Sequence, residues 1–187
     1  MEAQTGERAM RITGWAALAV GLALWGAARA DVVEAQPGGF QVKQSVEIAA
    51  PADKVWTAMG QIGSWWSSDH TWSHDARNLT LELRPGGCFC ETLPNGGGAR
   101  HLAVQLISPG KTAILEGTLG PLIFSGADGH LVWTLAEKDG HTTLTQTYYA
   151  GGYFPGGFDK IAPAVDHVLT DQIQRLKAYV ETGKPGA

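Results

Sequence analysis

A single long amphipathic segment ends the chain and limits the folds that are open to it. Asp159 in its first turn and Lys177 near its last turn suit the helix dipole, and Gly183 and Pro185 end it. A helix of roughly 24 residues is long enough to cross a whole sheet. The residues that share one side of this helix are Phe158, Ile161, Val165, Leu169, Gln172, Ile173, Leu176, Tyr179 and Val180.

Before this helix, the chain reads as a series of short strands separated by turns. Asp139-Gly140 is a strong two-residue hairpin signal, and many of the 25 glycines lie at such turns. A short helix that starts at Pro51 interrupts the series after its first strand. Alternating apolar residues predict strands near 40–48, 79–83, 88–91, 102–106, 113–116, 131–135 and 142–149.

Hairpin-linked strands bracketed by helices are typical of an α+β fold with the helices on one face of an antiparallel sheet. We expect one domain over residues 40–182, preceded by a polar lead-in at 31–39 and followed by a tail at 183–187. The space between a twisted sheet and a long helix is the natural place for a ligand in such a fold.

The first thirty residues resemble a secretory leader. Arg8 and Arg11 precede an apolar run over residues 12–25, and Ala28-Arg29-Ala30 is a small-x-small cleavage site. We expect residues 1–30 to be a signal peptide cleaved after Ala30, so that the protein is exported to the periplasm or secreted. The alternatives are a membrane anchor, for which an apolar run of about 14 residues is short, and a true start at Met10.

The net charge excludes one class of partner. The chain carries −4, and removal of a leader with three arginines and two glutamates leaves −5. A mildly acidic domain lacks the positive patches that attract nucleic acid. We therefore expect no nucleic-acid partner, and no stable membrane insertion after cleavage, because no later segment reaches membrane-spanning length.

Cys88 and Cys90 are the only cysteines, one residue apart. On a strand they share a face, and a disulfide between such close neighbours is expected to be strained. We expect the two cysteines to be packing residues rather than a disulfide that stabilises the fold. Redox-active or intermolecular thiols and metal ligands are the alternatives, although the spacing is not that of a zinc site.

Three segments resemble the START-like, helix-grip superfamily, also called SRPBCC. They are "VEIAAPADKVWTAMGQIGSWW", the hairpin "LELRPGGCFCE" and the terminal helix. The likeness covers about residues 40 to 182, and its nearest branch contains polyketide-cyclase-like proteins and homologues of heat-shock ATPase activators. The resemblance implies a curved antiparallel sheet wrapped around the C-terminal helix and a cavity that binds a ligand, but it does not specify an activity.

Several side chains are candidates for lining such a cavity. Flat aromatic faces stack on ring-bearing ligands, inward-facing amides orient a ligand in apolar walls, and the glycine-flanked loop 151–157 is either a lid or a connector. The amides alternatively bond one another or a buried water. The candidates are Trp65, Trp66, Trp72, Trp133, Gln146, Tyr148, Tyr153, Phe154, Leu169 and Gln172.

Three further residues are candidates for acid–base chemistry. His70 and His74 are four residues apart and share a face if that segment is helical, which suits either a metal site or an acid–base pair, although Thr71 and Ser73 favour irregular structure. Glu91 becomes a proton donor only if burial raises its pKa. Alternatively it forms an ordinary ion pair with Arg100 on the next strand, which also carries His101.

The preferred interpretation is an exported single-domain protein that binds an apolar or aromatic small molecule between the sheet and the C-terminal helix, without a cofactor or metal. A cofactor-free cyclase or hydrolase that uses His70, His74 or Glu91 is the first alternative. A co-chaperone-like interaction module is the second. No nucleotide-binding or standard hydrolase motif is present.

Overall fold

An antiparallel sheet in the order β1-β2-β8-β7-β6-β5-β4-β3 forms the frame of the computed structural model, which describes Met1 and residues 29–186. The strands are β1 Arg29–Gln36, β2 Gly39–Ile48, β3 Leu79–Leu81, β4 Cys88–Thr92, β5 Gly98–Ser108, β6 Thr112–Gly117, β7 Gly126–Lys138 and β8 His141–Tyr153. The α-helices are α1 Ala52–Gly60 and α2 Phe158–Thr182. Short 3-10 turns η1–η5 lie at Ile62–Ser64, Ser68–His70, Ala76–Asn78, Pro94–Gly96 and Gly120–Phe124.

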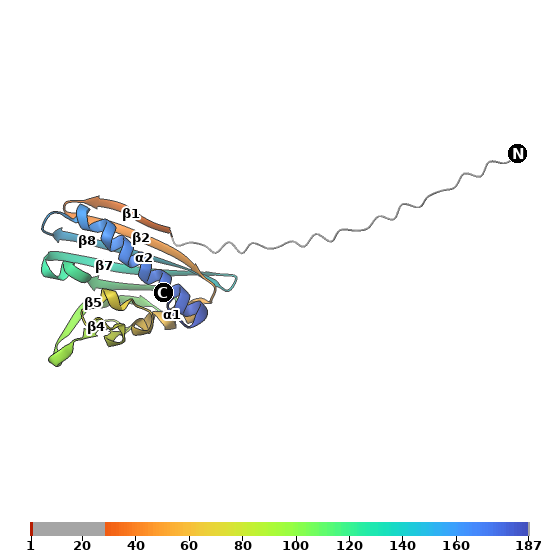
Figure 1. The fold of residues 1–187 in the computed structure, drawn as a ribbon, viewed down its shortest axis with the longest axis horizontal. Coiled ribbons are helices and arrows are strands. Elements are labelled where there is room, and N and C mark those ends of the chain that lie inside the picture. The colour runs from red at the N-terminus through yellow and green to blue at the C-terminus, as the bar shows by residue number, and fades with distance from the viewer. Residues whose placement is uncertain (2–28, 187) are drawn as a thin grey trace.

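The curved sheet wraps around α2, which runs obliquely across its concave face (Figure 1). The helix packs on β2, β1 and α1. Its buried side chains recur at helical spacing and include Phe158, Leu169, Ile173 and Leu176. The predicted α+β helix-grip fold is therefore confirmed. None of the helices in the described part of the chain is long and apolar enough to cross a membrane.

The turn chemistry read from the sequence explains the longest hairpin. β7 and β8 pair over their whole length, and Lys138 faces His141 at the end of the pair. The two residues between them, Asp139 and Gly140, both have positive φ, at 53° and 78°. This conformation defines the tight hairpin turn that Asp-Gly favours.

The polar segment that we expected as a lead-in instead contributes an edge strand. Residues 31–36 lie in β1, which pairs antiparallel with β2. Every side chain from Asp31 to Gln36 is exposed, so the segment shows no alternation of apolar and polar residues. The predicted leader falls almost entirely on residues 2–28, outside the described part of the chain, and cleavage after Ala30 stays a prediction.

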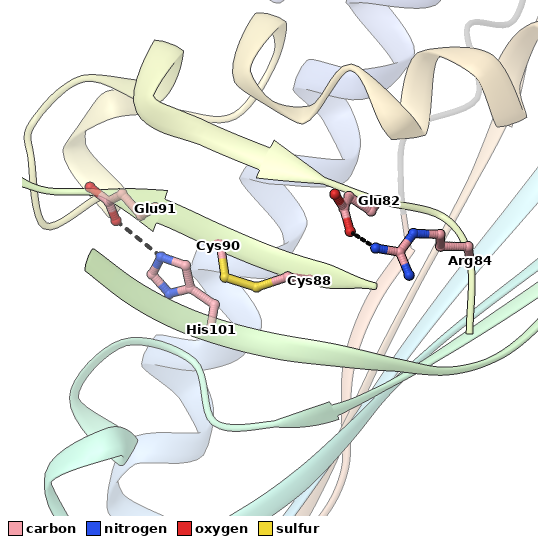
Figure 2. The surroundings of a disulfide bond; sticks show 6 residues. All are labelled: Glu82, Arg84, Cys88, Cys90, Glu91 and His101. Atoms are coloured by element: carbon pink, nitrogen blue, oxygen red, sulfur yellow. Dashed lines mark hydrogen bonds and ion pairs between the residues drawn. A yellow bond between two sulfur atoms is a disulfide. The ribbon is translucent and has the colours of Figure 1, made fainter. Parts of the chain in front are cut away.

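The two cysteines are joined in a disulfide, so the expectation of two unlinked packing residues is wrong. Two residues of regular strand advance by about 6.6–6.8 Å, whereas the Cα atoms of Cys88 and Cys90 are 5.3 Å apart. The β4–β5 register shifts at this point: His101 of β5 has no partner between the pairs Phe89–Leu102 and Cys90–Arg100, so the bulge lies on β5, opposite Phe89 and Cys90. Figure 2 shows the bridge beside Glu91 and His101.

Removing this disulfide is expected to cost little stability. A bridge between Cys88 and Cys90 closes a loop of three residues, and so restricts the unfolded chain much less than a long-range bridge does. We expect the Cys88→Ser/Cys90→Ser double variant to lose no more than about 1.5 kcal/mol of unfolding free energy, measured in urea. A loss above about 3 kcal/mol contradicts this and identifies the bridge as a staple of the fold.

Candidate functional site

A pocket of about 270 Å³ lies between the N-terminal half of α2 and the segment that follows α1. The helix contributes one wall. The spacing of its wall residues, i, i+3, i+4, i+7 and i+8, places them on a single face of the helix. These residues are Ile161, Ala164, Val165, Val168 and Leu169.

The opposite wall is aromatic. Trp66 and Phe89 form an edge-to-face pair with ring centroids 5.3 Å apart, and the His101 ring lies 4.9 Å from Phe89. Trp66 also donates a hydrogen bond from Nε1 to the His70 carbonyl at 3.1 Å, which holds the loop over the pocket. Leu119, Gly120 and Pro121 complete the lining on another side. Apolar walls with a few polar groups are typical of a small-molecule site.

One side of the pocket is formed by η2 and the residues after it, several of which are exposed, and we call this side the mouth. Asp69, His70, Thr71 and Trp72 all border the pocket. Trp72 is 38% exposed and forms an edge-to-face pair with Phe124, which is 80% exposed, at 5.6 Å. An exposed ring of the lining, Trp72, therefore packs against a second exposed ring, Phe124, that does not itself line the pocket.

Glu91 and His101 form a buried hydrogen-bonded pair at the aromatic wall. His101 Nε2 lies 3.0 Å from Glu91 Oε2, with the side chains 7% and 0% exposed. The backbone N–H groups of Trp72 and Ser73 donate to the same carboxylate at 3.1 and 2.5 Å. The loop at the pocket mouth is thus tied to β4 through Glu91.

The register of β4 and β5 explains why Glu91 meets His101 rather than Arg100. Glu91 lies opposite Ala99, so His101 is its diagonal neighbour on the same face. Arg100 lies opposite Cys90 and is exposed. The cross-strand ion pair considered from the sequence is therefore not formed.

Hydrogen bonds keep Glu91 ionised. Burial by itself raises the pKa of Glu91, but the Ser73 hydroxyl and N–H, the Trp72 N–H and His101 together hold that pKa below its ordinary value of 4.5. Glu91 is therefore an acceptor of hydrogen bonds at neutral pH. The raised pKa that a proton-donating Glu91 needs is absent.

The lowered pKa of Glu91 predicts acid sensitivity. A carboxylate whose pKa is depressed in the folded protein contributes stability above its unfolded pKa, and loses it as the pH falls through the folded value. When the pH drops below about 4.5, we expect the unfolding free energy of the wild type to decrease. Glu91→Gln should be less stable at neutral pH but lose less on acidification, in urea titrations from pH 7 to pH 3. Parallel pH profiles for the two proteins contradict the role of Glu91.

A chain of buried amides occupies the middle of the interface between sheet and helix. Trp133 Nε1 donates to Gln146 Oε1 at 2.7 Å, and Gln146 Nε2 donates to Gln44 Oε1 and to the Leu169 carbonyl, both at 3.1 Å. Gln44 Nε2 in turn donates to Asp166 on α2 at 2.6 Å. These groups therefore act as hydrogen-bond partners for one another, which is the alternative to cavity lining stated above for the amides.

Three other predicted residues are also held within the protein, away from the pocket wall. Gln172 Oε1 accepts from the Ser67 N–H at 2.8 Å, and Trp65 Nε1 donates to the Ala58 carbonyl at 2.8 Å. Tyr148 donates to the Gly117 carbonyl at 3.2 Å. Burial raises the pKa of Tyr148 well above its ordinary value of 10, so the phenol stays protonated at neutral pH.

Of the predicted ligand-binding residues, Trp66, Trp72 and Leu169 border the pocket. Phe154 packs against Phe158 in the core, with ring centroids 5.7 Å apart, and Tyr153 is 70% exposed at the end of β8. Neither one lines the pocket. Whether the ten predicted residues bind ligand stays a prediction, but only these three are placed to touch one there.

The three predicted acid–base residues are not gathered in one place. Glu91 lies behind the aromatic wall and His70 lies at the mouth, while His74 is exposed, has a φ of 56° and does not line the pocket. Across the part of the chain that the structure describes, no three His, Cys, Asp or Glu side chains are grouped as a metal site requires.

Sequence reasoning did not assign His101, Phe89 or most of the α2 wall to the site. A signal for Phe89 was present, since it alternates with the two cysteines and so faces inward on β4. Ile161 and Val165 lay on the predicted apolar stripe of the helix, but a stripe does not show where the helix faces empty space rather than side chains.

Several solved structures share the fold of this protein. A conserved protein of unknown function, EF2215 from Enterococcus faecalis, is 17% identical with a TM-score of 0.57, covering 83% of this chain and 78% of its own. The Aha1 dimer from Colwellia psychrerythraea is 17% identical with a TM-score of 0.53, covering 77% of this chain and 98% of its own.

DynU16, from the dynemicin biosynthetic locus, is 24% identical with a TM-score of 0.54. The match covers 78% of this chain but spans only about half of DynU16, 48% of its length. At these identities the likenesses show the fold alone. No curated protein matches the chain.

The family model described as "Polyketide cyclase / dehydrase and lipid transport" matches residues 39–181. The match begins at the first residue of β2 and ends one residue before the end of α2. It agrees with the START-like, helix-grip resemblance seen in the sequence, and it covers well over half of the chain. The protein therefore belongs to the polyketide cyclase / dehydrase and lipid transport family.

Proposed function

We propose that the protein binds a small apolar or aromatic molecule in the pocket between α2, the aromatic wall and the mouth. One observation carries the proposal: an aliphatic helix face stands opposite Trp66 and Phe89 across a space of about 270 Å³. Burial of apolar ligand surface there supplies the driving force for binding, and the aromatic rings favour a flat ligand.

The size of the pocket limits the ligand. Pockets for drug-sized ligands measure about 300–1,000 Å³, so a space of about 270 Å³ suits a molecule of one or two rings. The family description, which names cyclases, dehydrases and lipid transport, supports a domain that holds a ligand. A co-chaperone-like role has less support, because the likeness to Aha1 extends to the fold alone.

Binding of a two-ring probe tests the proposal. We expect 2-methoxynaphthalene to bind with one-to-one stoichiometry in a ligand-observed NMR titration. At roughly 0.4 kcal/mol for each of its dozen or so non-hydrogen atoms, its Kd is about 0.3 mM or tighter. Native mass spectrometry of protein recovered from its own cells is expected to show one small-molecule adduct per chain. Failure of both measurements contradicts the proposal.

We also propose that the protein is exported with its leader removed after Ala30. The basic, apolar and small-residue parts of residues 8–30 support this, as does the Cys88–Cys90 disulfide, since disulfides persist in oxidising compartments. N-terminal sequencing of the natural protein is expected to begin at Asp31. A natural protein that begins at Met1 or Met10 contradicts cleavage.

A further inference from the structure

His101 combines burial and a fixed orientation at the wall of the pocket. Within the described residues, the only hydrogen bond of its side chain joins Nε2 to Glu91 at 3.0 Å, and the other ring nitrogen points away from the carboxylate (Figure 2). Among the described residues, no side-chain nitrogen or oxygen is both fully buried and without a partner. Nδ1 of His101 is therefore not fully buried, and the residue that carries it lines the pocket.

Glu91 determines which ring nitrogen of a neutral His101 carries the proton. An ionised carboxylate only accepts hydrogen bonds, and Glu91 accepts from the Trp72 and Ser73 N–H groups as well as from His101. Nε2 must therefore carry the hydrogen that Glu91 accepts. In the neutral imidazole, Nδ1 is then an acceptor with its lone pair free.

We infer that His101 Nδ1 accepts a hydrogen bond from a hydroxyl group on the bound ligand, and that Glu91 is the positioning residue that fixes this tautomer. The ligand class is a small aromatic or conjugated molecule that carries a phenolic or enolic O–H. The inference rests on the proposed function and deepens it. The rings of Phe89 and Trp66, next to His101, receive the flat part of such a molecule.

A matched pair of probes tests the inference in the wild-type protein. 2-Naphthol carries the hydroxyl donor, and 2-methoxynaphthalene has the same ring system without it. We expect 2-naphthol to bind about tenfold more tightly, the effect of one hydrogen bond to a buried group. Equal affinities, or a preference for the methoxy compound, overturn the inference but leave the proposed function standing. Binding of neither probe contradicts the proposed function itself.

Two variants then assign the preference to its residues. His101→Phe keeps a flat ring beside Phe89 but removes the acceptor, so the two probes should bind this variant with equal affinity and the tenfold preference should disappear. Glu91→Leu removes the acceptor that holds the hydrogen on Nε2, so Nδ1 carries the hydrogen in part of the molecules and cannot accept there. The preference for 2-naphthol should then fall below tenfold. If both variants keep the tenfold preference for 2-naphthol, a group other than His101 recognises the hydroxyl.

Discussion

Replacing Val168 with tryptophan is expected to abolish binding of 2-methoxynaphthalene, weakening it by at least about 100-fold. Val168 is half-buried on the α2 face that lines the pocket. An indole ring at this position extends into the empty space of about 270 Å³ rather than into packed side chains. The variant should therefore stay folded and lose the site. The measurement is a ligand-observed NMR titration of both proteins, with circular dichroism to verify the fold.

His167→Trp is the matched control for this experiment. It introduces the same ring one position earlier on α2, where the side chain is exposed and does not line the pocket. We expect wild-type affinity in this variant. Equal binding by Val168→Trp and the wild type shows that the ligand lies elsewhere, and equal loss in both tryptophan variants shows a general effect on the helix.

Gln146→Leu is expected to cause the largest loss of stability, about 3–5 kcal/mol of unfolding free energy. Leucine has a similar size but leaves the Trp133 Nε1–H, Gln44 Oε1 and the Leu169 carbonyl without their partner. Each buried group that loses its hydrogen bond costs about 1–3 kcal/mol. Since domains are stable by only about 5–15 kcal/mol, the change should be evident as a large drop in the urea midpoint.

Gln105→Leu is the corresponding control, because Gln105 is exposed on β5 and bonds only to Glu116 on the neighbouring strand. We expect a change of less than about 0.5 kcal/mol there. A small effect of Gln146→Leu, close to that of Gln105→Leu, shows that the amide chain between sheet and helix is not structurally important.

The fold could be predicted because its periodicities are strong. The alternating strands, the Asp139-Gly140 turn and the apolar stripe of α2 all follow local rules, and each element lies near its expected position. β1 was missed because an exposed edge strand has no buried face to impose alternation. The disulfide was missed because a regular strand would hold the two cysteines about 6.6–6.8 Å apart, whereas their Cα atoms are 5.3 Å apart.

The site was less predictable because it depends on what remains unfilled between elements. Gln146 and Gln172 were good candidates for polar groups that face the interior, and both are buried. Whether such an amide meets a ligand or another protein group depends on tertiary neighbours that spacing does not encode. The pairing of Glu91 with His101 likewise depends on the strand register, which a one-residue shift reverses.

A crystal structure of the protein with 2-methoxynaphthalene tests the central claim most directly. The account predicts that the ring system lies between Val165 and Val168 of α2 on one side and Trp66 and Phe89 on the other. A probe bound on the outer face of the sheet, or a pocket without the probe at saturating concentration, contradicts it.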